Sequence, residues 1–144
     1  ERKHLPVEEL ELSYRHSCIP GEGYIVLEAQ FKLEKRPEAE IRALMADLRD
    51  RRISKQPLEY PSAGSTFKRS EGYFAGKLIQ DAGLRGYRVG DAQVSEKHCG
   101  FVINKDNASA SDVLQLMHDV DDKVYSLFKV HLVPEVRIIG RNLD

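Results

Sequence analysis

A short segment rich in small residues holds the densest group of side chains able to do chemistry, and it reads YPSAGSTFKR from Tyr60 to Arg69. Small residues let a ligand approach the backbone closely. The segment and its flank offer hydroxyls and cations suited to phosphate or carboxylate, namely Ser62, Ser65, Thr66, Lys55, Lys68 and Arg69. A solvated turn with charged neighbours is the alternative, and spacing alone favours it because short motifs often match by chance.

Near the C-terminus, the run PEVRII alternates charged and apolar residues. In a strand, Glu135 and Arg137 would share one face, with Val136 and Ile138 on the other. A polar outer face is the commoner meaning of such a pattern. An Arg and a Glu aimed into a cleft beside a serine would instead form a carboxylate-binding acid–base set. Spacing does not choose between the two.

Several other chemistries are disfavoured. No GxxxxGKS or GxxxxGKT phosphate loop occurs, and Gly21-Glu-Gly23 lacks the third glycine of a dinucleotide fingerprint, so it indicates a turn. The five histidines show no HxxxH or HExxH spacing typical of zinc sites. Cys18 and Cys99 lie far apart, which predicts neither a disulfide framework nor a metal site.

The composition is that of a globular protein. The 144 residues are 41% hydrophobic and 31% charged, which suits one domain with its own core. Twenty-two basic and 23 acidic residues give a net charge of -1, so no global charge favours nucleic acid or a membrane. No apolar run reaches the roughly 18 residues that span a bilayer. The chain begins at Glu1 without Met, and we expect it to be part of a longer protein.

Hydrophobic periodicity predicts the elements that must position these residues. The run YIVLEAQFKL alternates roughly and predicts a strand over Tyr24–Leu33. Apolar residues at i, i+3, i+4 and i+7 predict an amphipathic helix over Pro37–Arg52, and they are Ile41, Leu44, Met45 and Leu48. Lys55–Gly72 has no period and contains Pro and Gly, which predicts a long polar loop.

Two more helices are predicted further along the chain. A short helix over Tyr73–Ala82 should end at Gly83. A long helix should run to Phe128 after Ser109, because Ser109-Ala-Ser-Asp112 has the layout of a capping box.

The remaining segments predict strands or extended chain. Gly100–Asn104 has the apolar run of a buried strand, and Val130–Ile139 is predicted to be extended. Strands and helices mix without a regular βαβα series. The predicted fold class is therefore α+β, with a mixed or antiparallel sheet and packed helices.

Taken in order, several segments resemble one known family. YRHS, RRISKQP, PSAGSTFKR, GYFAGKLIQDAGLRGYRVGDAQVSEKH, FVINKDNAS and PEVRIIG resemble the UDP-N-acetylenolpyruvoylglucosamine reductases, the MurB family of peptidoglycan precursor synthesis. The resemblance runs from Leu12 to Gly140. With no inserted segment between the first predicted strand and the following helix, the chain resembles the shorter, type II branch.

The resemblance implies a flavoenzyme, a UDP-N-acetylmuramate dehydrogenase. Members reduce FAD with NADPH, and the reduced flavin passes hydride to the enolpyruvyl group of UDP-N-acetylglucosamine-enolpyruvate. By resemblance Ser65 matches the proton donor, Glu135 the acid that stabilises the enolic intermediate, and Arg15 the arginine that binds the substrate carboxylate. A glutamate in that role must hold an acidic proton, which burial or a neighbouring anion would favour.

Further residues match binding positions of the family. Tyr14 matches an active-site tyrosine, and Lys55 matches a lysine that contacts the UDP diphosphate. Arg69 and His98 stand at substrate-binding positions where some members carry Asn and Gln.

The resemblance covers only the C-terminal portion of the family. Arg52 and Arg137 match arginines near the cofactor, but the N-terminal, glycine-rich FAD-binding portion has no counterpart in this sequence. Residues 1–34 resemble the last part of that FAD-binding domain, and residues 35–144 resemble the substrate-binding domain. We therefore expect a cytoplasmic oxidoreductase as the parent, with this chain alone inactive and not retaining FAD.

The expected partners are UDP-N-acetylglucosamine-enolpyruvate and NADPH, without nucleic acid or membrane. A non-catalytic phosphate- or nucleotide-sugar-binding module is the alternative function.

Overall fold

Two units make up the chain in the computed structural model, which describes residues 1–69 and 72–140. The first unit is Glu1–Pro37 and the second is Glu38–Asp144. The first unit contains a short 3₁₀ helix, η1 (Val7–Leu10), and one helical turn, α1 (Cys18–Gly21). Between them the backbones of Ser13 and His16 exchange two hydrogen bonds of 3.2 Å, which closes a tight turn.

The predicted strand over Tyr24–Leu33 is wrong for this chain, because the segment is neither helix nor strand. Its large aliphatic side chains are exposed, from 64% at Val26 to 85% at Leu33. A strand needs a neighbour to take up its backbone hydrogen bonds. Within the described part of the first unit, nothing pairs with this segment as a strand. The alternating pattern therefore marks a face that has no partner among these residues.

The predicted helix after Pro37 is confirmed as α2 (Glu38–Lys55), which begins one residue later and ends three residues later than expected. Exposed ion pairs of the i,i+4 type follow its surface, with 2.6 Å between Arg42 and Glu38. Such pairs each contribute only about 0.3–0.5 kcal/mol. All of α2 is described, and none of its side chains is buried. The apolar positions that predicted an amphipathic helix are 42–66% exposed, and they are Ile41, Leu44, Met45 and Leu48.

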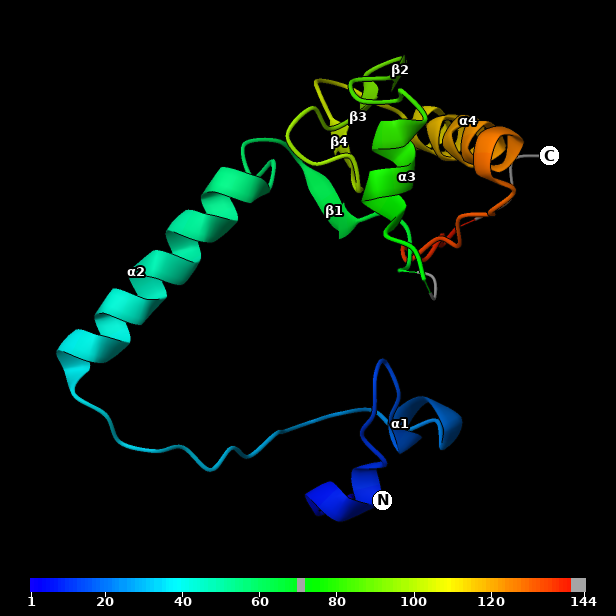
Figure 1. Ribbon diagram of the computed structural model, residues 1–144. Coiled ribbons are helices and arrows are strands. Elements are labelled where there is room, and N and C mark those ends of the chain that lie inside the picture. Colours follow the sequence, from blue (N-terminus) through cyan, green and yellow to red (C-terminus); the bar gives the residue numbers. More distant parts are fainter. Residues whose placement is uncertain (70–71, 141–144) are drawn as a thin grey trace. The chain divides into compact units, whose positions relative to one another are not determined.

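A four-stranded antiparallel sheet forms the centre of the second unit (Figure 1). Its strand order is β1-β4-β3-β2, and the strands are Ser62–Ser65, Arg88–Val89, Ala92–Val94 and Phe101–Asn104 in chain order. Strand β4 lies inside the sheet and confirms the strand predicted over Gly100–Asn104. The α+β fold class is confirmed.

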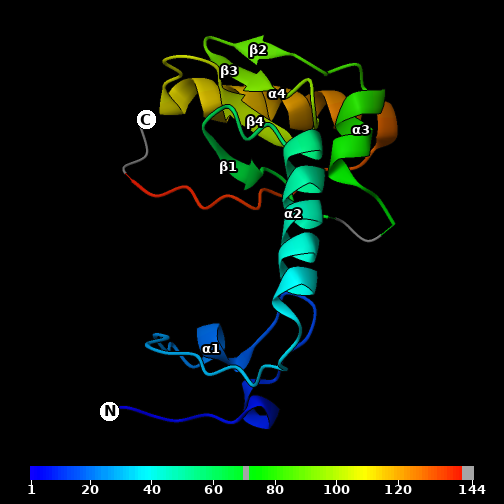
Figure 2. The same ribbon diagram turned by 90° about the vertical axis from the view of Figure 1, so that its left-hand side faces the viewer.

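Helices α3 (Ala75–Asp81) and α4 (Ala110–Phe128) cover the sheet and close the core (Figures 1 and 2). Helix α4 contacts β2, β3 and α3 through its apolar stripe. Leu116, Val120 and Val124 lie on that stripe and are completely buried. Both helices agree with their predicted ranges to within two residues, because a periodic apolar stripe that is actually buried is a reliable helix signal.

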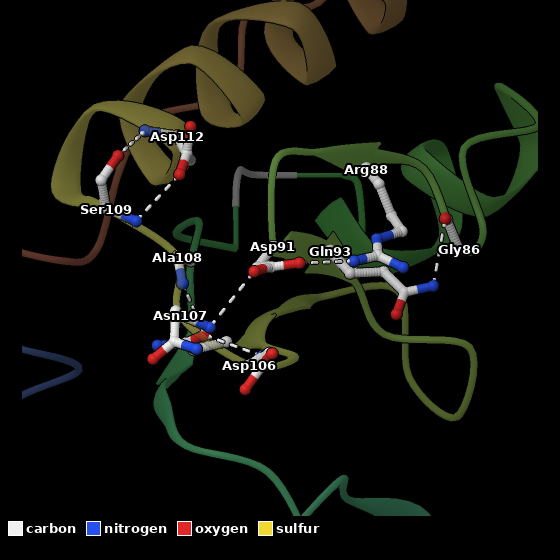
Figure 3. Close-up of polar contacts among 10 residues, drawn as sticks. Gly86, Arg88, Asp91, Gln93, Asp106, Asn107, Ala108, Ser109 and Asp112 are labelled. Atoms are coloured by element: carbon white, nitrogen blue, oxygen red, sulfur yellow. Dashed lines mark hydrogen bonds and ion pairs between the residues drawn. The ribbon is translucent and has the colours of Figure 1, made fainter.

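The start of α4 is fastened to the turn between β2 and β3 (Figure 3). The Ser109 hydroxyl accepts a 3.1 Å hydrogen bond from the Asp112 N–H, and the Asp112 carboxylate accepts one of 2.8 Å from the Ser109 N–H. This is the predicted capping box. Asp91 accepts further bonds from Arg88 at 2.8 Å and from the Asn107 N–H at 3.3 Å. The bond from Asn107 joins the segment between β4 and α4 to this turn.

The predicted loop over Lys55–Gly72 is wrong at its centre, where Ser62–Ser65 forms the edge strand β1. Residues 70–71 of that loop lie outside the described residues. SAGS has little strand propensity of its own. Pairing with β4 makes it a strand, since Ser62 stands opposite Ile103 and Ser65 opposite Phe101.

Candidate active site

Ser65 is the last residue of β1 and follows directly after a β-bulge. Two residues of β1, Ala63 and Gly64, stand opposite the single residue Val102 of β4, which is a β-bulge. Gly64 has φ +90°, a conformation that side chains rarely adopt. The bulge bends the strand, and the Ser65 side chain is exposed at its end.

A cleft of about 640 Å³ runs along this strand. It is lined by the end of α2, the connection to β1, β1 itself and the start of β4, with Arg52, Tyr60, Ser62, Gly64, Ser65 and Phe101 among its residues. Among the described residues that line it, Arg52 carries the only charge. A lining that contains a guanidinium, hydroxyls and open backbone suits an anionic, hydroxyl-bearing ligand such as a phosphorylated sugar.

Two lysines bond to Glu59 and Tyr60, in the connection between α2 and β1 that forms one side of the cleft. Lys105 Nζ lies 2.7 Å from the Tyr60 hydroxyl and 4.1 Å from the centre of its ring. Lys97 Nζ lies 3.2 Å from the Glu59 carboxylate. The pKa of Glu59 is lowered by a hydrogen bond from its own backbone and further by Lys97, which keeps the carboxylate charged and paired. The connection is therefore held at two consecutive residues by lysines from the segments before and after β4.

Glu135 lies beside the strand that carries Ser65. Its backbone N–H donates to the Thr66 carbonyl at 2.8 Å, and the Lys68 N–H donates to the Val133 carbonyl at 2.7 Å. The segment after α4 is thus extended along residues 66–68, as predicted, with Pro134 paired to Phe67. Glu135 is an exposed residue in this chain.

The predicted alternation around Glu135 holds over only three residues. Val136 packs against the core, whereas Glu135 and Arg137 are exposed. Ile138, expected on the buried side, is 65% exposed. The strand-like pattern therefore ends where the segment leaves the sheet edge.

Three other predicted site residues do not line the cleft, namely His98, Arg69 and Lys55. His98 is exposed, and its Nδ1 accepts a 3.1 Å hydrogen bond from the Gly100 N–H, which places the neutral ring's proton on Nε2. The His98 ring meets Phe101 of the cleft edge-on, at 5.1 Å between centres. The Arg69 guanidinium lies 4.1 Å from the centre of the Phe74 ring. Lys55 is the exposed last residue of α2, next to Gln56 of the lining.

Tyr14 and Arg15 belong to the first unit. They form the tip of the turn closed by Ser13 and His16, and Arg15 takes the left-handed conformation with φ 58°. The Arg15 guanidinium carbon lies 5.6 Å from the centre of the Tyr14 ring. The structure thus groups Arg52, Ser65 and the backbone of Glu135, and it holds Tyr14 and Arg15 together in a separate turn.

Tyr60, Phe101 and Thr66 are the site residues that sequence reasoning missed or undervalued. Tyr60 and Thr66 lie in the segment singled out at the start, but nothing in their spacing told a cleft wall from a solvated turn. Phe101 was assigned only to a buried strand. Its part in the cleft follows from the pairing of β4 with β1, which no local pattern reports.

The second unit is an α+β domain whose edge strand β1 presents Ser65 to a cleft that Arg52 of α2 also lines. The sequence profile of the UDP-N-acetylenolpyruvoylglucosamine reductase C-terminal domain matches residues 56–139. The chain belongs to this family.

Similar proteins carry the same name. The UDP-N-acetylenolpyruvoylglucosamine reductase of Agathobacter rectalis is 65% identical over 97% of this chain and 45% of its own length. That of Lachnoclostridium phytofermentans is 62% identical over 95% of this chain and 44% of its own length. The crystal structure of UDP-N-acetylenolpyruvylglucosamine reductase from Thermus caldophilus matches with a TM-score of 0.74 and 38% identity, over 90% of this chain and 46% of that one. The chain spans somewhat less than half the length of these relatives.

The cleft does not fit a whole flavin dinucleotide. Such a cofactor needs an apolar slot for its ring system and a separate group of donors for its pyrophosphate. The cleft along β1 offers one guanidinium and a mixed, open lining among the described residues. Over residues 1–69 and 72–140, no three His, Cys, Asp or Glu side chains gather as metal ligands, and no helix is long and apolar enough to cross a membrane.

Proposed function

We propose that this chain is the substrate-side part of a UDP-N-acetylenolpyruvoylglucosamine reductase. The proposal is supported by family membership and by matches that cover somewhat less than half of each relative. The observation that carries it is that Ser65 lines the same cleft as Arg52, with the Glu135 N–H bonded to Thr66, the residue that follows Ser65. The parent would be an oxidoreductase of peptidoglycan precursor synthesis, acting in the cytoplasm on UDP-N-acetylglucosamine-enolpyruvate.

In this proposal FAD and NADPH supply the hydride, and the residues of the chain handle the anion and the proton. Addition of hydride to the enolpyruvyl group places negative charge on its carboxylate side. A fixed cation such as Arg15 is suited to stabilise that charge as it develops. Ser65 then gives its proton to the enolic carbon. A serine is a weak acid in water, so the transfer depends on a dry site that holds the hydroxyl against that carbon.

The other matched residues receive binding roles in the same proposal. Lys55 at the end of α2 contacts the diphosphate of the substrate, and Tyr14 is the active-site tyrosine that precedes Arg15 in the chain. Arg69 and His98 take further substrate contacts. Arg52 and Arg137 take the roles of the family's arginines near the cofactor.

Glu135 would stabilise the enolic intermediate through its acidic form. Glu135 is exposed in this chain, and substrate or the FAD-binding portion would cover it in the parent.

The same proposal assigns the two portions of the chain. Residues 1–34 belong to the end of the FAD-binding domain, and residues 35–144 form the substrate-binding domain. The exposed apolar run within 24–33 is consistent with a segment that pairs in a larger domain. Alone, the chain would bind the UDP-sugar weakly, hold no FAD and have no turnover.

The proposal is tested with a chimera in which this chain replaces the matching C-terminal part of the Agathobacter rectalis reductase. We expect NADPH oxidation that depends on UDP-N-acetylglucosamine-enolpyruvate, at a rate within about tenfold of the relative. A correctly folded, FAD-loaded chimera without turnover would refute the catalytic assignment.

Binding by the chain itself is measured through Thr66, which is the only threonine in the sequence. A threonine methyl label therefore gives one NMR resonance, next to the cleft. UDP-N-acetylglucosamine should shift it in a saturable way. A shift together with an inactive chimera would support the alternative, a non-catalytic nucleotide-sugar-binding module.

A further inference from the structure

The bulge before Ser65 interrupts the regular pairing of β1 with β4 opposite Val102. On the side of β4 that faces β1, the Asn104 N–H donates to the Pro61 carbonyl at 2.9 Å. The next donor on that side is the Val102 N–H. It meets the point where two residues of β1 oppose one of β4, so the backbone ladder is interrupted there.

The Thr66 side chain takes this donor. Its Oγ1 accepts a hydrogen bond from the Val102 N–H at 3.0 Å, in a fully buried contact. Thr66 is only 3% exposed, so water cannot replace the hydroxyl. A buried backbone donor left without an acceptor is costly. The Thr66 hydroxyl therefore offsets the cost of the bulge, because it gives the buried Val102 N–H an acceptor.

The backbone of Thr66 is held just as firmly. Its N–H donates to the Gly100 carbonyl at 2.9 Å, and its carbonyl accepts the Glu135 N–H at 2.8 Å. Thr66 thus bonds to Gly100, just before β4, through its N–H, to Val102 of β4 through its side chain, and to the segment after α4 through its carbonyl. It stands between Ser65, which precedes it in the chain, and Glu135, which bonds to it across the sheet edge.

We propose that Thr66 is a positioning residue for Ser65 and Glu135, through the hydrogen bond from the Val102 N–H to its buried hydroxyl. The inference rests on the proposed function for its catalytic consequence. The bulge sets the direction of the Ser65 hydroxyl, and the Thr66 hydroxyl keeps the bulge in place. Loss of that acceptor lets residues 64–66 move, and the Glu135 backbone moves with the Thr66 carbonyl.

The test compares Thr66→Val with Thr66→Ser in the active chimera. Valine keeps the shape but removes the acceptor, whereas serine keeps the acceptor and loses only a methyl group. We expect Thr66→Val to lower kcat by about 10- to 100-fold, because even a small displacement of the reacting groups slows the reaction strongly. The KM for NADPH should change less than about threefold, and Thr66→Ser should restore kcat to within about threefold of the parent.

A second readout uses the 144-residue chain and needs no activity. Backbone amide exchange should speed up by about tenfold or more at Val102 and Glu135 in Thr66→Val, and stay near the parent in Thr66→Ser. Ser126→Ala removes an exposed hydroxyl on α4, bonded to the Lys123 carbonyl at 2.8 Å, and is the control. It should change neither kcat nor these amides.

The outcomes separate the two proposals. An inactive parent chimera refutes the proposed function, and the exchange of Val102 and Glu135 still decides the positioning role. A folded Thr66→Val protein with unchanged kcat, or with unchanged exchange at both amides, overturns the inference about Thr66. If Thr66→Val does not fold, Thr66→Ser must retain both kcat and exchange, and failure there overturns it as well.

Discussion

The backbone N–H of Glu135 donates a hydrogen bond to the carbonyl oxygen of Thr66, with 2.8 Å between nitrogen and oxygen. This one contact joins the segment after α4 to the strand that presents Ser65. Two candidate chemical groups from distant parts of the sequence are thereby brought to one edge of the sheet. The geometry of the contact depends on the backbone alone, so side-chain substitutions at Glu135 should leave it intact.

Glu135→Gln in the chimera therefore tests the chemistry of the carboxyl group separately from its placement. We expect kcat to fall by about 10²-fold or more, because glutamine has no acidic proton to share with the enolic intermediate. The backbone bond to Thr66 does not involve the carboxyl group and should remain. Glu40→Gln, on an exposed turn of α2, is the matched control and should keep full turnover. Full turnover by Glu135→Gln would contradict the assignment.

Cofactor retention is tested by the visible absorption spectrum of the purified 144-residue chain, taken beside its intact mass. We expect a colourless protein, because the cleft along β1 does not supply both parts of a flavin dinucleotide site. A flavin band at near-equal stoichiometry would mean that the chain holds FAD without the rest of its relatives' length. The assignment of residues 1–34 to an incomplete FAD-binding domain would then fail.

Stability should depend on the buried stripe of α4 and hardly on its exposed side. Leu116 is 0% exposed, and Leu116→Ala should lower the free energy of unfolding by about 2–5 kcal/mol. Leu127, on the same helix, is 51% exposed. Leu127→Ala makes the same chemical change and should cost less than about 1 kcal/mol. Denaturant unfolding measures both, and equal losses would contradict the position of the core.

The contact between Tyr87 and Asp119 predicts a defined pH dependence. The Tyr87 hydroxyl donates to the Asp119 carboxylate at 2.7 Å, which lowers the pKa of Asp119 and raises the pKa of Tyr87. The lowered pKa of Asp119 stabilises the fold above about pH 4, and this is lost as the pH falls through the folded-state value. The raised pKa of Tyr87 stabilises the fold below about pH 10, and this is lost as the pH rises through the folded-state value.

Tyr87→Phe should therefore unfold at a lower temperature than the parent between about pH 5 and pH 9, with the two melting curves converging below about pH 3. Tyr73→Phe removes the hydroxyl of a half-exposed tyrosine and serves as the control. A difference between Tyr87→Phe and the parent that persists unchanged at acid pH would show that the hydroxyl acts by some route other than the Asp119 carboxylate.

The sequence predicted those elements of the fold that depend on residues close together in the chain. The capping box of Ser109 and the apolar stripe of α4 depend on residues a few positions apart, and both are confirmed. Strand β1 could not be predicted, because SAGS becomes a strand only through its pairing with β4. The opposite error at Tyr24–Leu33 has the same cause, since an alternating pattern forms no strand without a neighbour. Ser65 was found through resemblance, whereas the acceptor role of Thr66 depends on a bulge that only the register reveals.

The proton-donor role of Ser65 is the central claim, and Ser65→Ala in the chimera tests it most directly. With Ser126→Ala as the control, steady-state NADPH oxidation and FAD content are measured for each protein. The account predicts that Ser65→Ala keeps its FAD, keeps the KM for the enolpyruvyl substrate to within about threefold, and loses about 10²- to 10⁴-fold in kcat. A Ser65→Ala chimera that turns over as fast as Ser126→Ala would contradict the account.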